Sequence, residues 1–102
     1  MADPIANLLR QAEPLASLSI SHLTPASRCK LAEGRLSVHA YPNDYGGLVH
    51  VGVRGDGLPE EADLLAIFDV AMRAELVWLK FDADAAVIDG LPVFEDEDRP
   101  VP

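Results

Sequence analysis

The sequence has little that ties it to an oxidising compartment, a membrane or a nucleic acid. Its one cysteine, Cys29, excludes an internal disulfide, which is typical of a reducing compartment. Its apolar stretches fall far short of the run of about 20 residues that crosses a bilayer. The first residues, Met1–Pro4, lack the basic and apolar regions of a secretory signal. We therefore expect a cytoplasmic protein without membrane contact.

Motifs that carry chemistry are also missing. The chain has no Gly-x-Ser-x-Gly motif, no phosphate-binding loop of glycines and lysine, no cysteine pair and no His-Glu helix motif. Cys29 lies between Arg28 and Lys30, whose charges favour a thiolate. Free cysteines are more often small buried apolar residues, and we expect Cys29 to be one. We predict no catalytic residues, no metal, no cofactor and no enzymatic activity.

Basic residues are scarce, with eight Lys and Arg against seventeen Asp and Glu, and the formal net charge is −9. The excess is confined to one half of the chain. Residues 1–58 carry five acids and five bases, whereas residues 59–102 carry twelve acids and three bases, a net of −9. Such a field repels nucleic acid and anionic membranes and attracts basic protein surfaces. Direct nucleic-acid binding is therefore not expected.

The chain has 102 residues, 49% of them hydrophobic, which is enough for one core. Asp3-Pro4 and Thr24-Pro25 each pair a capping residue with proline and predict helix starts, while alternating apolar residues predict strands. The predicted elements are a helix from 4 to 13, a strand at 17–23, a helix at 25–33, strands at 36–41 and 48–53, a helix from 59 to 72 and a strand at 77–82. Residues 86–88 leave room for a short fifth strand.

This order predicts an α+β domain of the ferredoxin-like, split β-α-β-β-α-β type with an extra N-terminal helix. We expect an antiparallel sheet with both main helices on one face. Residues 1–94 form the single domain in this prediction, and residues 95–102 form an acidic C-terminal tail. Because such folds carry many functions, the architecture does not indicate one.

One face of the predicted sheet carries polar and aromatic side chains, namely Ser19, Ser21, His39, Tyr41, His50, Trp78 and Lys80. RNA bases stack on sheet faces of this kind, but the negative field opposes phosphate binding. Alternatively, the N-terminal helix or a partner covers this face. The pair His39 and His50 lacks a third metal ligand, and Asp82-Ala83-Asp84 lacks the central glycine and closing glutamate of a calcium loop.

The acidic residues of the second half support two interpretations. On the first, they are a solvated face that keeps a small protein soluble. On the second, they imitate nucleic-acid phosphates and bind the lysines and arginines of a nucleic-acid-binding protein, with aromatic residues as anchors. The partner-binding residues predicted by the second interpretation are Glu60, Glu61, Asp63, Asp69, Asp82, Asp84, Asp89, Trp78, Tyr41 and Tyr45.

Four stretches, Ser19–Pro25, Tyr41–Gly47, Leu79–Asp84 and Ile88–Pro92, resemble a family of uncharacterised small bacterial proteins carried on plasmids and integrative elements. The resemblance implies an accessory protein of a mobile element, and it brings no known chemistry from which a catalytic residue follows. In size and acidity the chain also resembles anti-CRISPR and anti-restriction proteins, which bind a host defence complex.

These observations together predict a non-enzymatic inhibitor or adaptor. Its expected partner is a basic nucleic-acid-binding protein, above all a CRISPR effector complex, for whose basic surface it competes with DNA. Two other classes stay open. One is a metal-dependent or thiol enzyme, and the other is a self-associating module without an inhibitory role, which forms a homodimer through the face that bears Trp78.

Overall fold

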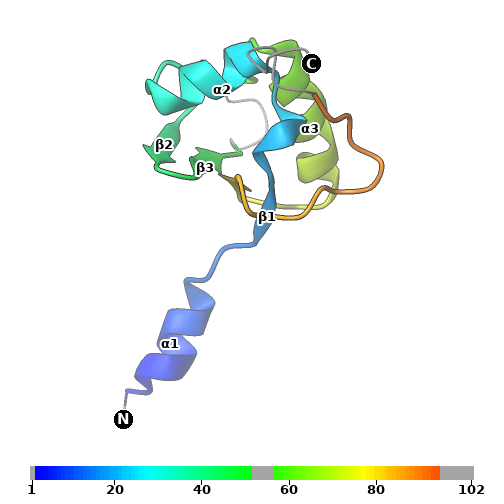
Figure 1. Cartoon of the computed structure of the whole chain (residues 1–102). Coiled ribbons are helices and arrows are strands. Elements are labelled where there is room, and N and C mark those ends of the chain that lie inside the picture. The colour runs from blue at the N-terminus through cyan, green and yellow to red at the C-terminus, as the bar shows by residue number, and fades with distance from the viewer. Residues whose placement is uncertain (1, 52–56, 95–102) are drawn as a thin grey trace.

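The predicted order of helices and strands is confirmed. The computed structural model describes residues 2–51 and 57–94. Its elements are α1 (Pro4–Arg10), β1 (Leu15–Ser19), the 3-10 turn η1 (Ile20–His22), α2 (Pro25–Ala32), β2 (Ala40–Asn43), β3 (Gly46–His50), α3 (Ala62–Arg73) and β4 (Trp78–Asp82). One helix thus precedes the series β-α-β-β-α-β (Figure 1). The predicted acidic tail at 95–102 and the predicted end of the third strand at 52–53 lie outside the described residues.

Side-chain caps set the starts of the first two helices. The Asp3 carboxylate and the Thr24 hydroxyl each accept a hydrogen bond from a backbone amide in the first turn of α1 and α2. The third helix begins at Ala62, later than the predicted start at Pro59. Its N-cap residue, Glu61, makes no side-chain cap bond, because its carboxylate binds the segment that precedes β2.

The four strands form one mixed sheet in the order β1-β4-β3-β2. β4 pairs antiparallel with β3 and parallel with β1, so the predicted all-antiparallel sheet is wrong at the β1/β4 pair and the ferredoxin-like topology is not confirmed. The alternation of apolar and polar residues along a strand assigns them to the two faces of the sheet, but it does not determine which strand lies next to it. β4 takes the central position, where Leu79 and Phe81 are buried, and β1 lies at the edge, where Leu15 is exposed.

Two predicted strands are shorter than their alternating letters suggest. β1 ends at Ser19 because the Ser19 hydroxyl accepts a hydrogen bond from the Ser21 amide at 3.1 Å, which turns the chain into η1. β2 begins only at Ala40, since the preceding segment is bound to the start of α3 through Ser37. Residues 86–88 form no strand. They make one backbone hydrogen bond to β1, from the Ser19 amide to the Ala86 carbonyl at 3.0 Å.

The core lies between the sheet and two helices, α2 and α3, which cover the same face (Figure 1). The predicted apolar stripe of the last helix is mostly correct. Its buried members pack against Leu18, Val49, Leu79 and Phe81 of the sheet, whereas Leu65 and Met72 are exposed. The buried members of α3 are Leu64, Ile67, Phe68 and Ala71. Among the described residues, no helix is long and apolar enough to cross a membrane.

The first helix does not pack on the domain. α1 extends away from the sheet, and the described part of the chain measures 64 × 29 × 27 Å (Figure 1). Its apolar residues Ile5, Leu8 and Leu9 keep 72%, 73% and 68% of their surface exposed. The amphipathic pattern predicted the helix correctly, but the helix does not cover the polar face of the sheet.

Residues 83–94, which we call the strap, run without regular structure past η1 and are held there by His22. This ring is 1% exposed, and both of its nitrogens are bonded. Nδ1 lies 2.7 Å from the Pro92 carbonyl, which only accepts, and Nε2 lies 2.9 Å from the Ile88 amide, which only donates. The ring is therefore neutral with its proton on Nδ1. The Arg28 guanidinium also donates to the Phe94 carbonyl.

We expect His22→Phe to destabilise the fold. A phenyl ring preserves the volume but leaves the partly buried Ile88 amide and Pro92 carbonyl without their partner, which lowers the free energy of unfolding by about 1–3 kcal/mol. Urea denaturation followed by circular dichroism measures this change. His39→Phe is the control, because His39 is exposed in a loop, and an equal loss in both variants would contradict the role of His22.

Candidate functional site

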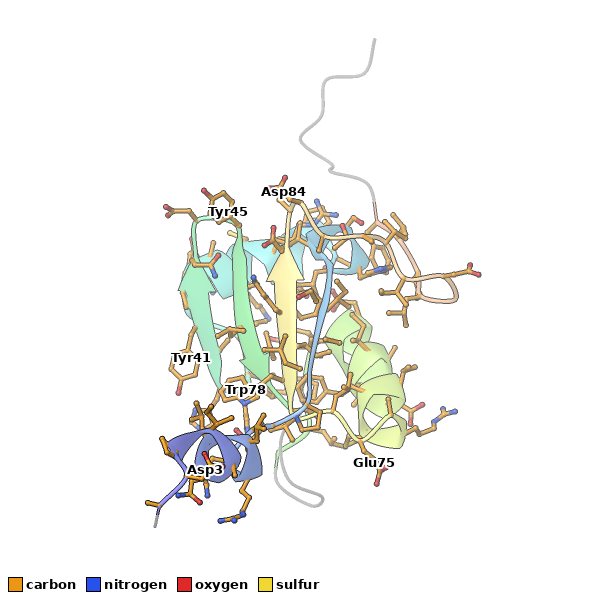
Figure 2. The ribbon with its side chains drawn as sticks, turned by 90° about the horizontal axis from the view of Figure 1, so that it is seen from below. Asp3, Tyr41, Tyr45, Glu75, Trp78 and Asp84 are labelled. Carbon is orange, nitrogen blue, oxygen red and sulfur yellow. The ribbon has the colours of Figure 1, made fainter. Side chains whose placement is uncertain are left out.

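The helices that the structure describes leave one face of the sheet uncovered (Figure 2). In the antiparallel registers Tyr41 lies opposite Leu48, Leu48 opposite Lys80, and His50 opposite Trp78. Residues opposite each other point to the same side, and so do alternate residues of β4, which adds Asp82 to this side. We call this surface the open face; it consists of Tyr41, Leu48, His50, Trp78, Lys80 and Asp82.

Trp78 is the centre of an aromatic cluster on the open face. Its ring centroid lies 4.8 Å from that of His50, edge to face, and 6.1 Å from that of Tyr41. The indole Nε1–H donates to the Glu13 carboxylate at 3.0 Å. Trp78 is only half-buried and Tyr41 is exposed. Two aromatic rings are thus positioned and accessible, as in binding hot spots.

A second group lies at the opposite ends of the strands, where Figure 2 shows Tyr45 in the β2–β3 turn and Asp84 just after β4. The Ala83 amide donates to the Tyr45 carbonyl at 2.8 Å, which joins the β2–β3 turn to the turn after β4. The Asp82 carboxylate accepts from the Asp84 amide at 2.8 Å and lies 4.0 Å from the Lys80 ammonium. Tyr45 is 61% exposed. The sheet-end cluster is Tyr45, Asp82 and Asp84.

Gly46 allows this close approach of the two turns. A β-carbon at Gly46 would lie 2.1 Å from the Phe81 carbonyl oxygen, well inside contact distance. The missing side chain lets β3 begin directly against the end of β4, where Gly46 pairs with Asp82. The sheet-end cluster therefore has a fixed backbone, although its side chains are at the surface.

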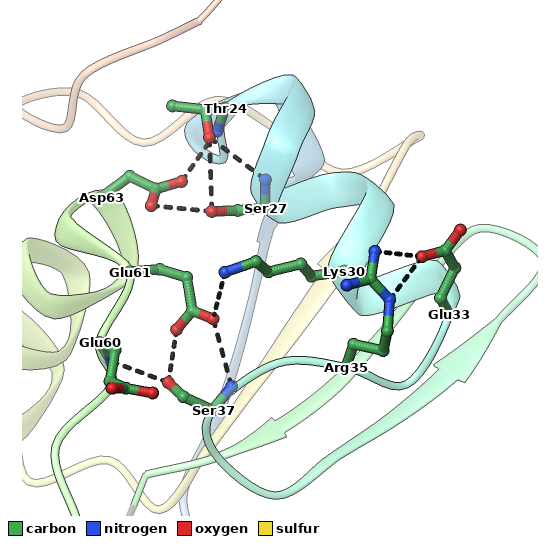
Figure 3. Close-up of polar contacts among 9 residues, drawn as sticks. All are labelled: Thr24, Ser27, Lys30, Glu33, Arg35, Ser37, Glu60, Glu61 and Asp63. Carbon is green, nitrogen blue, oxygen red and sulfur yellow. Dashed lines mark hydrogen bonds and ion pairs between the residues drawn. The ribbon is translucent and has the colours of Figure 1, made fainter.

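Two of the predicted partner-binding acids are instead bonded within the domain (Figure 3). Asp63, in the first turn of α3, accepts from the Thr24 amide at 2.8 Å and from the Ser27 hydroxyl at 2.9 Å, both at the start of α2. Its negative charge thus lies at two helix N-termini, where helix dipoles favour it. Asp63 joins the starts of the two helices.

Glu61 is the second of these acids and is only 8% exposed. Its carboxylate accepts from the Ser37 hydroxyl at 2.5 Å, from the Ser37 amide at 3.2 Å and from the Lys30 ammonium at 3.4 Å (Figure 3). The neighbouring Glu60 amide donates to the Ser37 hydroxyl oxygen at 2.8 Å. Glu61 therefore fixes the segment between α2 and β2 to the start of α3.

The surroundings of Glu61 shift its acidity. Burial raises the pKa of its carboxyl, but hydrogen bonds from the Ser37 hydroxyl, from backbone amides and from Lys30 together lower it more, so the pKa of Glu61 lies below its ordinary value of 4.5. A carboxyl with a lower pKa in the folded chain stabilises the fold above its unfolded pKa. That contribution is lost as the pH falls through the folded value.

We expect Glu61→Gln to lower the free energy of unfolding at neutral pH by about 1–2 kcal/mol, because the amide keeps one acceptor but loses the charge. The variant loses less further stability than the native chain below about pH 4.5, since it has no carboxyl to protonate. Urea denaturation across a pH series measures both effects. Glu60→Gln, whose side chain is exposed, provides the control, and identical pH profiles for Glu61→Gln and the native chain would refute the assignment.

The ten predicted partner-binding residues do not form one surface. Asp69 is ion-paired with Arg73 one turn further along α3, and Asp89 is exposed on the strap. Glu60, Glu61 and Asp63 lie together at the start of α3. The remaining five share the open face and its edge, with Tyr41 and Trp78 toward one end and the sheet-end cluster at the other (Figure 2).

The expected burial of Cys29 is wrong, because its side chain is exposed on α2. It occupies the outer side of a helix whose buried residues are Ser27 and Leu31. His39 and His50 are joined through their backbones, by a hydrogen bond from the His50 amide to the His39 carbonyl at 3.0 Å. Within residues 2–51 and 57–94, no three His, Cys, Asp or Glu side chains are placed to hold a metal ion.

Sequence reasoning missed two contributors to these sites. Leu48 belongs to the open face, and Glu13 positions the Trp78 indole, whereas His50 lies on this face as its alternation predicted. Alternation within 48–50 also offered a signal for Leu48. No sequence signal pointed to Glu13, because its partner lies 65 residues away.

The fold and the open face define a small acidic α+β domain with a four-stranded mixed sheet and one accessible sheet face. Residues 15–96 match DUF5983, a family of unknown function, over the C-terminal domain of that family. The match covers most of the chain, and the protein therefore belongs to this family. α1 precedes the matched region. No curated protein and no solved structure matches the chain.

Proposed function

We propose that this chain is a non-enzymatic binding protein that attaches to a basic protein surface through its open face and sheet-end cluster. The main observation that supports this proposal is that Asp82 and Asp84 lie at one end of the same face that bears Tyr41 and Trp78. Accessible aromatic rings beside carboxylates suit a surface of arginines and lysines, because arginine stacks on aromatic faces and pairs with carboxylates.

Charge supports this choice of partner. The formal net charge of −9 attracts a basic surface over several ångströms before contact and speeds the encounter. The same field repels the phosphates of DNA and RNA, which argues against direct nucleic-acid binding by the open face. A basic protein that normally binds nucleic acid offers the positive surface that the open face requires, and it needs no direct contact between the open face and nucleic acid.

The contact surface in this proposal is smaller than the acidic half of the sequence. Glu61 and Asp63 act inside the domain, where their oxygens are occupied by internal donors. Asp69 is partly neutralised by Arg73. The proposal therefore assigns partner contact to Tyr41, Tyr45, Trp78, Asp82 and Asp84.

The proposed partner is a nucleic-acid-handling host defence complex, with a CRISPR effector as the leading case, and the proposed origin is a mobile genetic element. The small size and the acidity support this assignment, since a carboxylate surface competes with DNA for the same arginines and lysines. The proposed place of action is the cytoplasm, where such complexes bind DNA.

A gel-shift assay tests the proposal. A guide-loaded CRISPR effector complex is mixed with labelled target DNA and an excess of this protein, and the fraction of bound DNA is measured. We expect the protein to reduce DNA binding, and the inhibition to weaken as salt screens the charges. DNA binding that is unchanged at excess protein, across effector complexes of different types, would refute the proposed partner class.

Matched variants locate the contact. Asp82→Asn combined with Asp84→Asn is expected to raise the half-inhibitory concentration about tenfold, the equivalent of roughly 1.4 kcal/mol. Trp78→Ala is expected to raise it at least as much, as hot-spot truncations do. Asp69→Asn combined with Glu75→Gln removes the same charge from two exposed acids on α3 and in the turn that follows it. If this control variant loses as much inhibition, net charge rather than the open face is responsible.

A further inference from the structure

The outer side of β1 is an open edge of the sheet. β1 is an edge strand, and its one neighbour in the described sheet is β4. Along a strand, the amides and carbonyls of successive residues point alternately to its two sides. The Pro14 carbonyl accepts at the start of β4, whereas the Ser19 amide points outward, to the Ala86 carbonyl. By this alternation, the amides and carbonyls of Leu15 and Ser17 also point outward.

Leu15 and Ser17 have no backbone partner on this outer side among residues 2–51 and 57–94. Unpaired edges bind further strands, and proteins protect such edges with charged residues, proline or a covering segment. β1 has the sequence Leu-Ala-Ser-Leu-Ser, which contains neither a charge nor a proline. The strap covers only its end, because the bond from Ser19 to Ala86 is the one backbone bond between them in the described chain. The middle of the edge is therefore open to an added strand.

A small apolar groove adjoins this edge, between β1, α3 and the strap (Figure 2). Ala16 and Leu18 of β1 line it, together with Val70 of α3 and with Ile88 and Leu91 of the strap. All of its lining residues are apolar, and its volume of about 120 Å³ has room for one aliphatic side chain. Val70 and Ile88 remain exposed at its rim.

The edge and the groove together fit one extended peptide. In a strand added to β1, a residue opposite Ala16 or Leu18 points to the same side of the sheet as those side chains, which is the side of the groove. The backbone beside that residue lies against the outward groups of Leu15 and Ser17. In this binding mode, main-chain hydrogen bonds supply affinity and a pocket selects a side chain. A helix does not fit, because its own amides and carbonyls are bonded to each other.

Charge defines the peptide further. Glu75 and Asp89 are exposed, and each lies next in sequence to a residue that lines the groove. Arg73 has the same position, but its charge is paired with Asp69. The formal net charge of −9 attracts positive segments from a distance. The favoured peptide therefore carries lysine or arginine around one aliphatic residue.

We propose that β1 and the groove bind an extended, positively charged segment of a protein partner. The segment adds a strand to the sheet beside β1 and places one aliphatic side chain in the groove. This site is separate from the open face, because it uses backbone groups and an apolar lining rather than aromatic rings and carboxylates. It holds a single short segment and does not require a large interface.

An NMR titration of the full chain tests the proposal. The probe is the peptide Lys-Lys-Thr-Leu-Thr-Lys-Lys, blocked at both ends. We expect the amide signals of Leu15 and Ser17 to shift until the protein is saturated. A peptide with glutamine in place of leucine is expected to bind at least fivefold more weakly. A peptide with glutamate in place of every lysine is expected not to bind, since it meets like charge.

N-methylation of the peptide tests whether it binds as a strand. A methyl group on an amide that faces β1 removes a hydrogen bond, whereas one on an amide that faces solvent does not. We expect successive N-methyl positions along the peptide to alternate between at least tenfold weaker binding and unchanged binding. Attraction by charge alone gives no such alternation.

Two pairs of protein variants locate the site. Ser17→Pro removes an outward amide at a position where an edge strand tolerates proline, and it is expected to raise the dissociation constant at least tenfold. Ser17→Ala keeps the amide and is the control. Val70→Gln places an amide on the groove rim and is expected to weaken the leucine peptide at least fivefold, but not the glutamine peptide. Leu65→Gln, on the same helix but outside the groove lining, leaves both unchanged.

Several results would overturn strand addition at β1. One is the absence of shifts at Leu15 and Ser17 at millimolar peptide. Another is binding that does not alternate along the N-methyl series, which would indicate attraction by charge alone. A third is self-association of the chain that Ser17→Pro abolishes, which would assign the edge to a second copy. The titration contains no effector complex, so its result and that of the gel-shift assay are independent.

Discussion

Two carboxylates at the start of α3 hold the domain together. Asp63 receives the N-terminal donors of α2, and Glu61 receives the hydroxyl and amide of Ser37. The two helices and the segment that leads into β2 are thereby fixed relative to one another at their polar ends, while Leu31 and Leu64 complete the apolar layer above the sheet. Each carboxylate is satisfied by several donors, which is the condition under which a charge is tolerated near a core. Because Ser37 lies three residues before β2, the junction also holds the segment that enters the sheet at that edge.

The sequence contained enough local information for the elements and their faces. Prolines after capping residues marked α1 and α2, and alternation along Val77–Asp82 correctly predicted which residues of β4 are buried. Longer-range features had no local signal. The parallel pairing of β1 with β4 is decided by which strand takes the buried centre, and His22 bonds to residues 66 and 70 positions away. Periodicity reports the environment of a residue, whereas a partner this distant depends on the whole fold.

The candidate site shows the same division. Tyr41 and Trp78 were predicted as anchors from residue type and alternation, and they do lie together on the open face. The acids were chosen by their number in the second half of the chain, and number does not separate a carboxylate that holds two helices from one that faces water. Glu61 and Asp82 have the same formal charge but very different surroundings. Burial and donor geometry distinguish them, and both require coordinates.

The central place of β4 has a consequence for how the protein is made. β1 and β3 flank β4 and do not pair with each other, so the sheet cannot close until residues 78–82 have left the ribosome. Before then only the short β2–β3 hairpin is available, and an isolated hairpin is at best marginally stable. The apolar faces of β1 and α3 remain unpacked until β4 has been synthesised. The domain therefore folds after most of these residues have been made, rather than progressively from its N-terminus.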